Sequence, residues 1–369
     1  MLEVQKYLRS GKSVDDLNAE FAINVASHPE LPLLILNYDQ IESKRKIHPI
    51  VRECRGLVLN TKDWSLVARS FPRFFNWGEV QEEIKNFDFS NFITQSKEDG
   101  SLVLIYQFKG KWHTNTRGSF GSLQMQNQNF SWQEGICKAL NVNNINDLHP
   151  KLDQSLCYVC EFVSPWNKIV RNYDSPRMYL LTAFNGKNEI HHNDVDKITH
   201  DIFLRPTKYS FTKIEEIQDF LKLQASNDPT FEGVVICDHN NQRFKIKSST
   251  YIGFHKIRGN GNNIFNPKNL LPFILTGEKE ELLTYFSEVK ETFEKIECQV
   301  QVFYNQIEEL WRKCKDIENQ KEFALAVKDH PFASVLFQTR KKYGKYHNEK
   351  ELKKEFTSSQ DLILKKIIN

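Results

Sequence analysis

A lysine that precedes a short acidic turn is the first group in the sequence that could do chemistry. Lys97 is followed by Glu98, Asp99 and Gly100, and the apolar segment 101–108 then has the pattern of a strand. A lysine amine is nucleophilic only after it has lost its proton, and its reference pKa is about 10.4. Neighbouring cations or burial must therefore activate it. The spacing suits a nucleophile held in a tight turn.

A second group of cations lies on a later predicted strand. Lys245 and Lys247 alternate with Phe244 and Ile246, so the two lysines share one face while the apolar residues face a core. Such a pair could supply the neighbouring cations that activate the Lys97 amine. However, a K-x-K strand is more often a solvated face, and a K-x-D-G tetrapeptide is common by chance. Neither motif decides the function alone.

The segments that position these groups change in character along the chain. Between about 50 and 250, short β-branched or aromatic segments predict an α+β domain. Helices are expected near 121–141 and 213–224, and Asn185-Gly186 is typical of a type I′ hairpin. The predicted strands are 56–60, 101–108, 157–163, 178–185, 233–238 and 243–248.

After about residue 255 the pattern becomes helical. Residues 259–269 predict a linker, and the apolar stripe that follows, spaced by four and three, predicts one helix of about 35 residues. An intramolecular bundle is favoured over a coiled-coil partner, because further helices are predicted at 319–328 and 349–367. The domains are therefore 1–255 and an all-α 256–369. The stripe consists of Leu282, Phe286, Val289, Phe293, Ile296, Val300, Phe303, Ile307, Leu310 and Cys314.

Composition excludes several classes of protein. The chain has 369 residues and a formal net charge of +3. No apolar run of about 18 residues exists, so no spanning helix is expected, and the N-terminus lacks the apolar core of a secretory signal. Seven scattered cysteines suit free thiols in a reducing compartment. In particular, Cys157 and Cys160 would face opposite sides of a strand, which argues against a metal or redox pair. We expect a soluble, cytoplasmic protein.

The C-terminal end of the chain is locally basic. Residues 340–369 contain nine Lys or Arg against four Asp or Glu. A solvated helix face would explain this charge. Contact with a polyanion such as RNA would explain it equally well.

Taken together, four motifs occur in the order found in covalent nucleotidyltransferases. Within that superfamily the chain most closely resembles the bacteriophage RNA ligase 1 family, the ATP-dependent tRNA-repair ligases, over about residues 38–255. The four motifs begin at Lys97, Glu161, Glu232 and Lys245. Further points of resemblance are Glu53-Cys54-Arg55-Gly56, Arg73-Phe74-Phe75-Asn76, Phe162-Val163-Ser164-Pro165, Asn167-Lys168-Ile169-Val170, Leu204-Arg205-Pro206 and Ser248 with Tyr251.

Three details favour this family over its relatives. DNA ligases usually place an arginine two residues after the motif glycine, where this chain has Leu102. Capping enzymes tend to follow the glycine with an aliphatic residue, where this chain has Ser101. Both also carry an OB-fold after the last lysine motif, which would give closely spaced strands. This chain has helical patterns there.

The resemblance implies an α+β nucleotidyltransferase fold and ATP-dependent joining of RNA ends. Lys97 would form a lysyl-AMP with ATP, AMP would pass to an RNA 5′-phosphate, and an RNA 3′-hydroxyl would displace it. Lys245 and Lys247 would neutralise the α-phosphate. Arg55 and Arg73 would hold ATP phosphates or the RNA end, although the family commonly has lysine where Arg73 stands.

The resemblance also implies roles for residues that spacing alone would not select. Glu161 would bind the ribose hydroxyls, and Glu232 would assist the metal or the lysine. Tyr38 would contact the nucleotide. Arg117 matches a family lysine that contributes to activity and would contact RNA or phosphate, and Tyr251 matches a family tyrosine beside the last lysine motif.

A triphosphate substrate implies Mg²⁺ or Mn²⁺. Glu280 and Glu281 fall where the family has an aspartate pair linked to the metal, but they could equally be acids that favour a helix N-terminus. The resemblance further implies repair of nicked tRNA, with the helical domain selecting tRNA. We expect the protein to act as a monomer, in the host cytoplasm if the source is viral. Two alternatives stay open: a catalytically silent RNA-binding module and a GTP-dependent capping guanylyltransferase.

Overall fold

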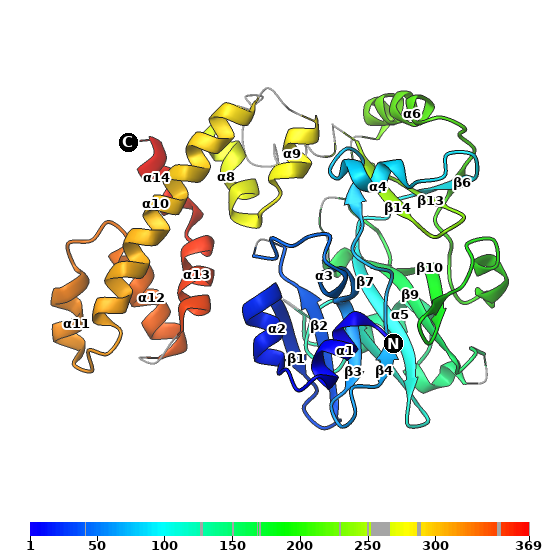
Figure 1. Ribbon diagram of the computed structural model, residues 1–369, viewed down its shortest axis with the longest axis horizontal. Helices are drawn as coiled ribbons and strands as arrows, with labels where there is room; N and C mark the ends of the chain where they lie inside the picture. The colour runs from blue at the N-terminus through cyan, green and yellow to red at the C-terminus, as the bar shows by residue number, and fades with distance from the viewer. Residues whose placement is uncertain are drawn as a thin grey trace. The chain divides into compact units, whose positions relative to one another are not determined.

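The computed structural model describes residues 1–40, 42–125, 128–149, 151–167, 169, 171–228, 230–248, 251, 266–285, 289–344 and 348–368. The chain divides into two compact units, Met1–His255 and Lys256–Asn369. Figure 1 shows the first unit as sheets with helices on their faces and the second as helices. The predicted linker 259–269 lies mostly outside the described residues, as do Lys168, Val170 and Phe286.

The first sheet of the N-terminal unit has four antiparallel strands. Their order is β1 (Ile23–Ser27), β2 (Leu33–Tyr38), β3 (Arg55–Asn60) and β4 (Leu66–Ala68). One face packs against α1 (Glu3–Arg9), α2 (Val14–Phe21) and α3 (Pro49–Glu53) through an apolar core. The helix α1 is held by the Glu53 carboxylate, which accepts hydrogen bonds from the backbone N–H groups of Glu3 and Val4.

The second sheet packs against the other face of the first. Its order is β11 (Asn188–Glu189), β10 (Arg177–Asn185), β9 (Leu156–Val163), β7 (Ser101–Phe108) and β8 (Lys111–Thr116). Cys157 belongs to the core between the two sheets, whereas Cys160 belongs to the core on the far side. The prediction that these thiols face opposite sides of the strand is therefore confirmed.

The far face of this second sheet is covered by helix α5 (Trp132–Leu140). The prediction of a helix from 121 was wrong at its N-terminal end. The Ser131 hydroxyl accepts a hydrogen bond from the Glu134 backbone N–H, and the Glu134 carboxylate accepts one from the Ser131 N–H. This capping box begins the helix at Trp132.

The hairpin at Asn185 differs in type from the prediction. Asn185 pairs with Asn188, so Gly186 and Lys187 form the loop. Gly186 has a φ of 56°, and Lys187 does not have a positive φ. A positive φ at the first loop position alone is the pattern of a type II′ turn rather than type I′.

The third sheet carries the paired lysines. Its order is β12 (Lys208–Tyr209), β6 (Phe92–Ser96), β13 (Gly233–Asp238), β14 (Arg243–Lys247) and β5 (Phe75–Asn76), and only the β14–β5 pairing is parallel. Helices α4 (Gln81–Lys85) and α6 (Ile214–Asn227) accompany this sheet, whose apolar face packs against α6. The chain crosses from this third sheet to the second between β6 and β7, at residues 97–100.

The second unit is an all-helical bundle around one core. The single 35-residue helix was a wrong prediction, because α9 (Lys279–Tyr285) and α10 (Lys290–Cys314) are separate helices. Tyr304 and Trp311, rather than Phe303 and Leu310, occupy the buried positions of α10. The other helices are α8 (Pro267–Thr276), α11 (Gln320–Val327), α12 (Ala333–Tyr343), α13 (Glu349–Ser358) and α14 (Gln360–Ile368).

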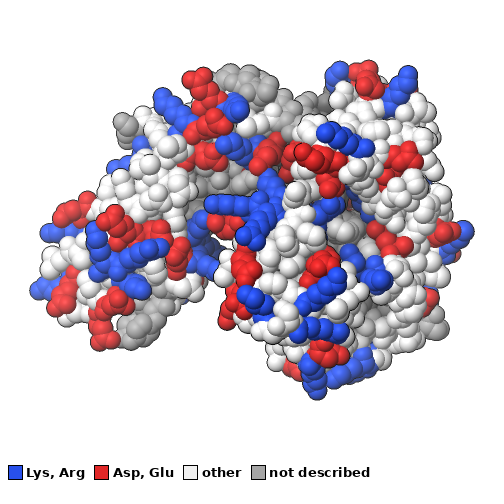
Figure 2. Space-filling view, in the orientation of Figure 1, with Lys and Arg blue, Asp and Glu red and all other residues white. Residues whose placement is uncertain are grey.

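These cores confirm the predicted intramolecular bundle and the predicted fold class, an α+β unit of antiparallel sheets followed by helices. The segment 349–367 forms two helices rather than one, since α13 ends at Ser358. Within the described ranges, no helix has both the length and the apolar character needed to span a membrane. On the face that Figure 2 shows, Lys and Arg are interspersed with Asp and Glu over both units.

Candidate active site

All three sheets of the N-terminal unit contribute to one site. Lys97 lies in the turn between β6 of the third sheet and β7 of the second, and Glu161 lies on β9 of the second. Tyr38 and Arg55 come from neighbouring strand ends of the first sheet, where Asn37 pairs with Arg55. The sheets therefore bring residues that are far apart in the chain to one site.

The turn around Lys97 depends on close backbone contacts. The Lys97 backbone N–H donates to the Gly233 carbonyl at 2.9 Å. A Cβ on Gly233, whose φ is 143°, would lie 2.3 Å from the Ile246 carbonyl oxygen, and a Cβ on Gly100 would lie 2.3 Å from the Phe162 carbonyl oxygen. Because no larger residue fits these approaches, the glycines of two predicted motifs fix the turn between the two sheets.

The side chain of Lys97 is bound by a buried carboxylate. Its Nζ lies 2.7 Å from Oε1 of Glu232, and Nζ of Lys247 lies 3.3 Å from the same oxygen. Oε2 of Glu232 is buried and has no hydrogen-bond partner within the described part of the chain. Glu232 thus contacts both the predicted nucleophile Lys97 and Lys247, one of the predicted paired lysines.

A second carboxylate near Lys97 has an altered titration. Burial raises the pKa of the Glu161 carboxyl to about 7. The positive charges of Lys97 and Arg55 lower this pKa, whereas the negative charge of Glu232 raises it further. Such a shift is typical of groups gathered at functional sites. Glu161 is half-buried, and it lines a cavity that Lys97 also lines.

A cluster of guanidinium groups surrounds the phenol ring of Tyr38. The Arg73 guanidinium lies 4.4 Å from the ring centroid, and that of Arg117 lies 4.9 Å from it. Burial alone would raise the pKa of the Tyr38 phenol, but Arg117, Arg55, Arg73 and Lys245 outweigh it and lower the pKa to about 8. Positive charge is therefore concentrated at this end of the site.

Two of these arginines have capacity for an anionic ligand. Nη1 of Arg55 and Nη1 of Arg73 are buried and lack hydrogen-bond partners among the residues that the structure describes. Burial lowers the pKa of Arg55 to about 10. A phosphate oxygen could accept from such guanidinium groups.

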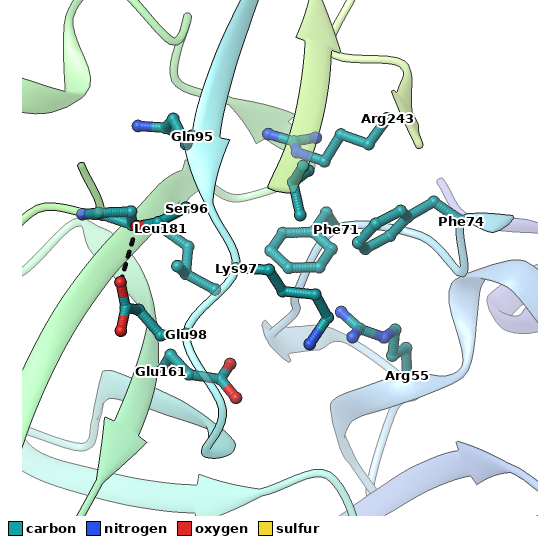
Figure 3. A pocket seen from close by; sticks show the side chains of 12 residues that line it. Arg55, Phe71, Phe74, Gln95, Ser96, Lys97, Glu98, Glu161, Leu181 and Arg243 are labelled. Atoms are coloured by element: carbon teal, nitrogen blue, oxygen red, sulfur yellow. Dashed lines mark hydrogen bonds between the residues drawn. The ribbon is translucent and has the colours of Figure 1, made fainter. Parts of the chain in front are cut away.

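The neighbouring cavity spans about 550 Å³ of space, part of which is open to solvent. In Figure 3, Lys97 and Arg55 point toward one another across it, and Glu161 lies on the side of the second sheet. The cavity is lined by Arg55, Phe71, Phe74, Gln95, Ser96, Lys97, Glu98, Glu161, Leu181, Pro206, Val235 and Arg243.

Strand β14 shows the alternation that the sequence predicted. Lys245 and Lys247 are half-buried on one face, and Phe244 and Ile246 are buried on the other. The prediction missed Arg243, which has the same parity, lines the cavity and pairs with Glu189 at a distance of 3.1 Å between Nη1 and Oε2. Extending the period-two pattern by one step would have identified it.

The remaining predicted residues are divided between the two units. Tyr251 is buried and donates to Oδ1 of Asp99 at 2.8 Å, and Arg117 donates from Nε to Oδ1 of Asn37 at 3.2 Å. Glu280 is exposed on α9 of the second unit, and the side chain of Glu281 lies outside the described residues. The metal role of the acid pair therefore stays a prediction.

The fold and the family match together define a nucleotidyltransferase. A family model described as RNA ligase matches residues 53–251, which is more than half of the chain. The chain therefore belongs to this RNA ligase family, as the resemblance predicted.

Two curated relatives and one solved structure are similar to the chain. "Putative bifunctional polynucleotide kinase/RNA ligase" of Autographa californica nuclear polyhedrosis virus is 31% identical, covering 79% of this chain but only 42% of its own length. "RNA ligase" of Rhodothermus phage RM378 is 23% identical and covers 77% of this chain and 80% of its own. A solved archaeal ATP-dependent RNA ligase is 13% identical with a TM-score of 0.49, covering 87% of each chain.

The pKa of Glu161 leads to a prediction about stability. The folded-state pKa is about 7 against an ordinary value of 4.5, so the folded protein binds this proton more tightly than the unfolded chain does. The Glu161 carboxyl should therefore reduce the stability of wild type as the pH rises through this window. Glu161→Gln lacks this contribution.

Between pH 5 and pH 8, the free energy of unfolding of Glu161→Gln should rise relative to wild type by roughly 1–2 kcal/mol, a value reduced for partial contact with solvent. Denaturant titrations of both proteins at the two pH values measure this difference. A difference that does not change with pH would contradict the assigned shift.

Proposed function

We propose that the protein is an ATP-dependent RNA ligase that joins a 5′-phosphate to a 3′-hydroxyl end. In the first step, Nζ of Lys97 attacks the α-phosphorus of ATP; an N–P bond forms, the bond to the bridging oxygen breaks, and pyrophosphate leaves. An oxygen of the RNA 5′-phosphate then displaces Lys97 from the AMP. Finally, the RNA 3′-hydroxyl attacks the adenylated phosphate and AMP leaves.

The observation that carries this proposal is the set of contacts around Lys97. A lysine held by backbone contacts between two sheets lies 2.7 Å from a buried carboxylate and lines a cavity that also presents Arg55 and Glu161. Family membership supports the same reaction class. A solvated lysine would need none of these contacts.

The cations suit the charge that develops in the first step. Lys245, Lys247, Arg55 and Arg73 would stabilise phosphate oxygens as pyrophosphate leaves. The buried Nη1 atoms of the two arginines, which lack a hydrogen-bond partner in the described part of the chain, fit this role. We assign Tyr38 and Arg117 to the same end, where Tyr38 would contact ATP and Arg117 the RNA or a phosphate. The Arg73 and Arg117 guanidinium groups both lie against the Tyr38 ring, so their charges are gathered before substrate binds.

The carboxylates are suited to the ribose and to a divalent cation. Glu161 would accept hydrogen bonds from ribose hydroxyls. Oε2 of Glu232, which has no hydrogen-bond partner among the residues that the structure describes, fits a position beside Mg²⁺ or Mn²⁺. When bound, such an ion would neutralise phosphate charge. Glu280 and Glu281 are proposed as a second contribution to metal binding.

We propose that the substrate is broken RNA, with nicked tRNA as the preferred form and the helical unit 256–369 as the part that selects it. Its exposed lysines, among them Lys354, Lys365 and Lys366, could contact phosphates without reading sequence. The protein would act as a monomer in RNA repair. Seven free cysteines fit a reducing cytoplasm, that of the host if the source is viral.

The first test concerns the nucleophile. Lys97→Ala should abolish covalent transfer of labelled AMP from ATP to the protein, because the amine that forms the N–P bond is gone. Joining of RNA that already carries a 5′-adenylate should continue, since the last step needs only the rest of the pocket. AMP that remains bound to the mutant after denaturing electrophoresis would assign the nucleophile elsewhere.

The second test concerns the paired lysines. Lys245→Ala and Lys247→Ala should each slow adenylylation by at least about 10²-fold, the loss typical of one transition-state donor. Arginine should restore activity incompletely, because its planar fork cannot replace a point charge. Lys111→Ala, an exposed lysine on β8, is the matched control. Near-normal rates in both β14 mutants would show that these lysines only solvate the strand.

The third test concerns the helical unit in the intact chain. Lys354→Gln/Lys365→Gln/Lys366→Gln should leave lysyl-AMP formation unchanged but reduce joining of a nicked anticodon loop several-fold more than joining of an unstructured oligonucleotide. The control removes three exposed lysines of the first unit, Lys62, Lys85 and Lys187. An equal ratio of the two joining rates in both triple mutants would argue against a role in tRNA selection.

A further inference from the structure

A segment that none of the predicted motifs includes holds the nucleophile turn from outside. Tyr173 lies between η2 (Pro165–Asn167) and β10, and only 6% of its surface is exposed. Its hydroxyl donates to Oε2 of Glu98 at 3.1 Å and accepts from the backbone N–H of Asp99 at 3.1 Å. One phenol thus binds the two residues that directly follow Lys97.

The same network continues on the other side of Lys97. The Ser96 hydroxyl donates to Oε1 of Glu98 at 2.7 Å, the contact drawn as a dashed line in Figure 3. The Ser96 hydroxyl in turn accepts from the Thr207 backbone N–H at 2.9 Å. Glu98 therefore accepts hydrogen bonds from both Ser96 and Tyr173. The residues directly before and after Lys97 are thus both held by hydrogen bonds.

Two further hydrogen bonds hold the Asp99 carboxylate of the turn, and one of them comes from the segment that contains Tyr173. The backbone N–H of Arg171 donates to Oδ2 of Asp99 at 2.7 Å, while Tyr251 donates to Oδ1 of the same carboxylate. Burial, followed by the Glu98 charge, raises the pKa of the Tyr173 phenol. The hydroxyl consequently keeps its proton and remains a donor to Glu98.

We propose that Tyr173 is a positioning residue for the first step, a role that rests on the proposed function. Tyr173 is not among the residues that line the cavity, but it fixes the backbone from which Lys97 reaches the α-phosphate. Small displacements of a reacting group can cost large factors in rate. The last step does not use Lys97 as a nucleophile, so the same hydroxyl should not affect it.

Tyr173→Phe keeps the ring and removes only the hydroxyl. At saturating ATP, the single-turnover rate of lysyl-AMP formation should fall about tenfold, the usual scale for a lost buried hydrogen bond. The ATP concentration at half-maximal rate and the rate of joining pre-adenylated RNA should stay within about twofold. Tyr106→Phe is the matched control, because its buried hydroxyl has no hydrogen-bond partner among the described residues.

A double mutant tests the route through Glu98. Ser96→Ala removes the other hydroxyl bound to Glu98, so combining it with Tyr173→Phe should cost less than the product of the two single losses. Independent losses, equal losses in both steps, or a Tyr173→Phe adenylylation rate within about twofold of wild type would overturn the positioning role. If wild type itself acquires no AMP from ATP, the proposed function fails instead.

Discussion

The site depends on one crossing of the chain between two sheets. Residues 97–100 connect β6 of one sheet to β7 of another. The backbone N–H of Lys97 donates a hydrogen bond to the Gly233 carbonyl at that junction. Gly100 and Gly233 permit approaches that a Cβ would block at 2.3 Å. Since both sheets are anchored by separate apolar cores, the nucleophile has a rigid base although it lies in a turn.

The charges around this crossing are arranged before any ligand binds. Glu232 contacts Lys97 and Lys247, while Arg73 and Arg117 flank Tyr38. Concentrating cations is unfavourable in itself. The buried Nη1 atoms of Arg55 and Arg73, which have no hydrogen-bond partner among the described residues, add to that cost. A phosphate substrate would offset both, which is why this arrangement suits catalysis on a nucleotide better than stability alone.

Much of this arrangement was accessible from the sequence because it repeats with short periods. The alternation of β14 predicted the shared face of Lys245 and Lys247, and the separation of Cys157 from Cys160 predicted their opposite faces. Both are local consequences of strand geometry. The resemblance to a family supplied Tyr38, Arg55 and Arg117, for which no spacing rule exists.

Long-range contacts could not be predicted in the same way. Tyr173 meets Glu98 and Asp99 across more than 70 positions of the chain, and nothing in its own neighbourhood signals that contact. The error at 282–314 has a different cause. The apolar spacing runs in the same phase from α9 into α10, so periodicity alone cannot locate where one helix ends and the next begins.

Lys97 is the group that we propose as the acceptor of AMP. This proposal is tested most directly by incubating wild-type protein with a divalent cation and either ATP or GTP, then mapping the covalent adduct by mass spectrometry of its peptides. We expect AMP on Lys97 and no GMP adduct. AMP on a different residue, or GMP in preference to AMP, would contradict it.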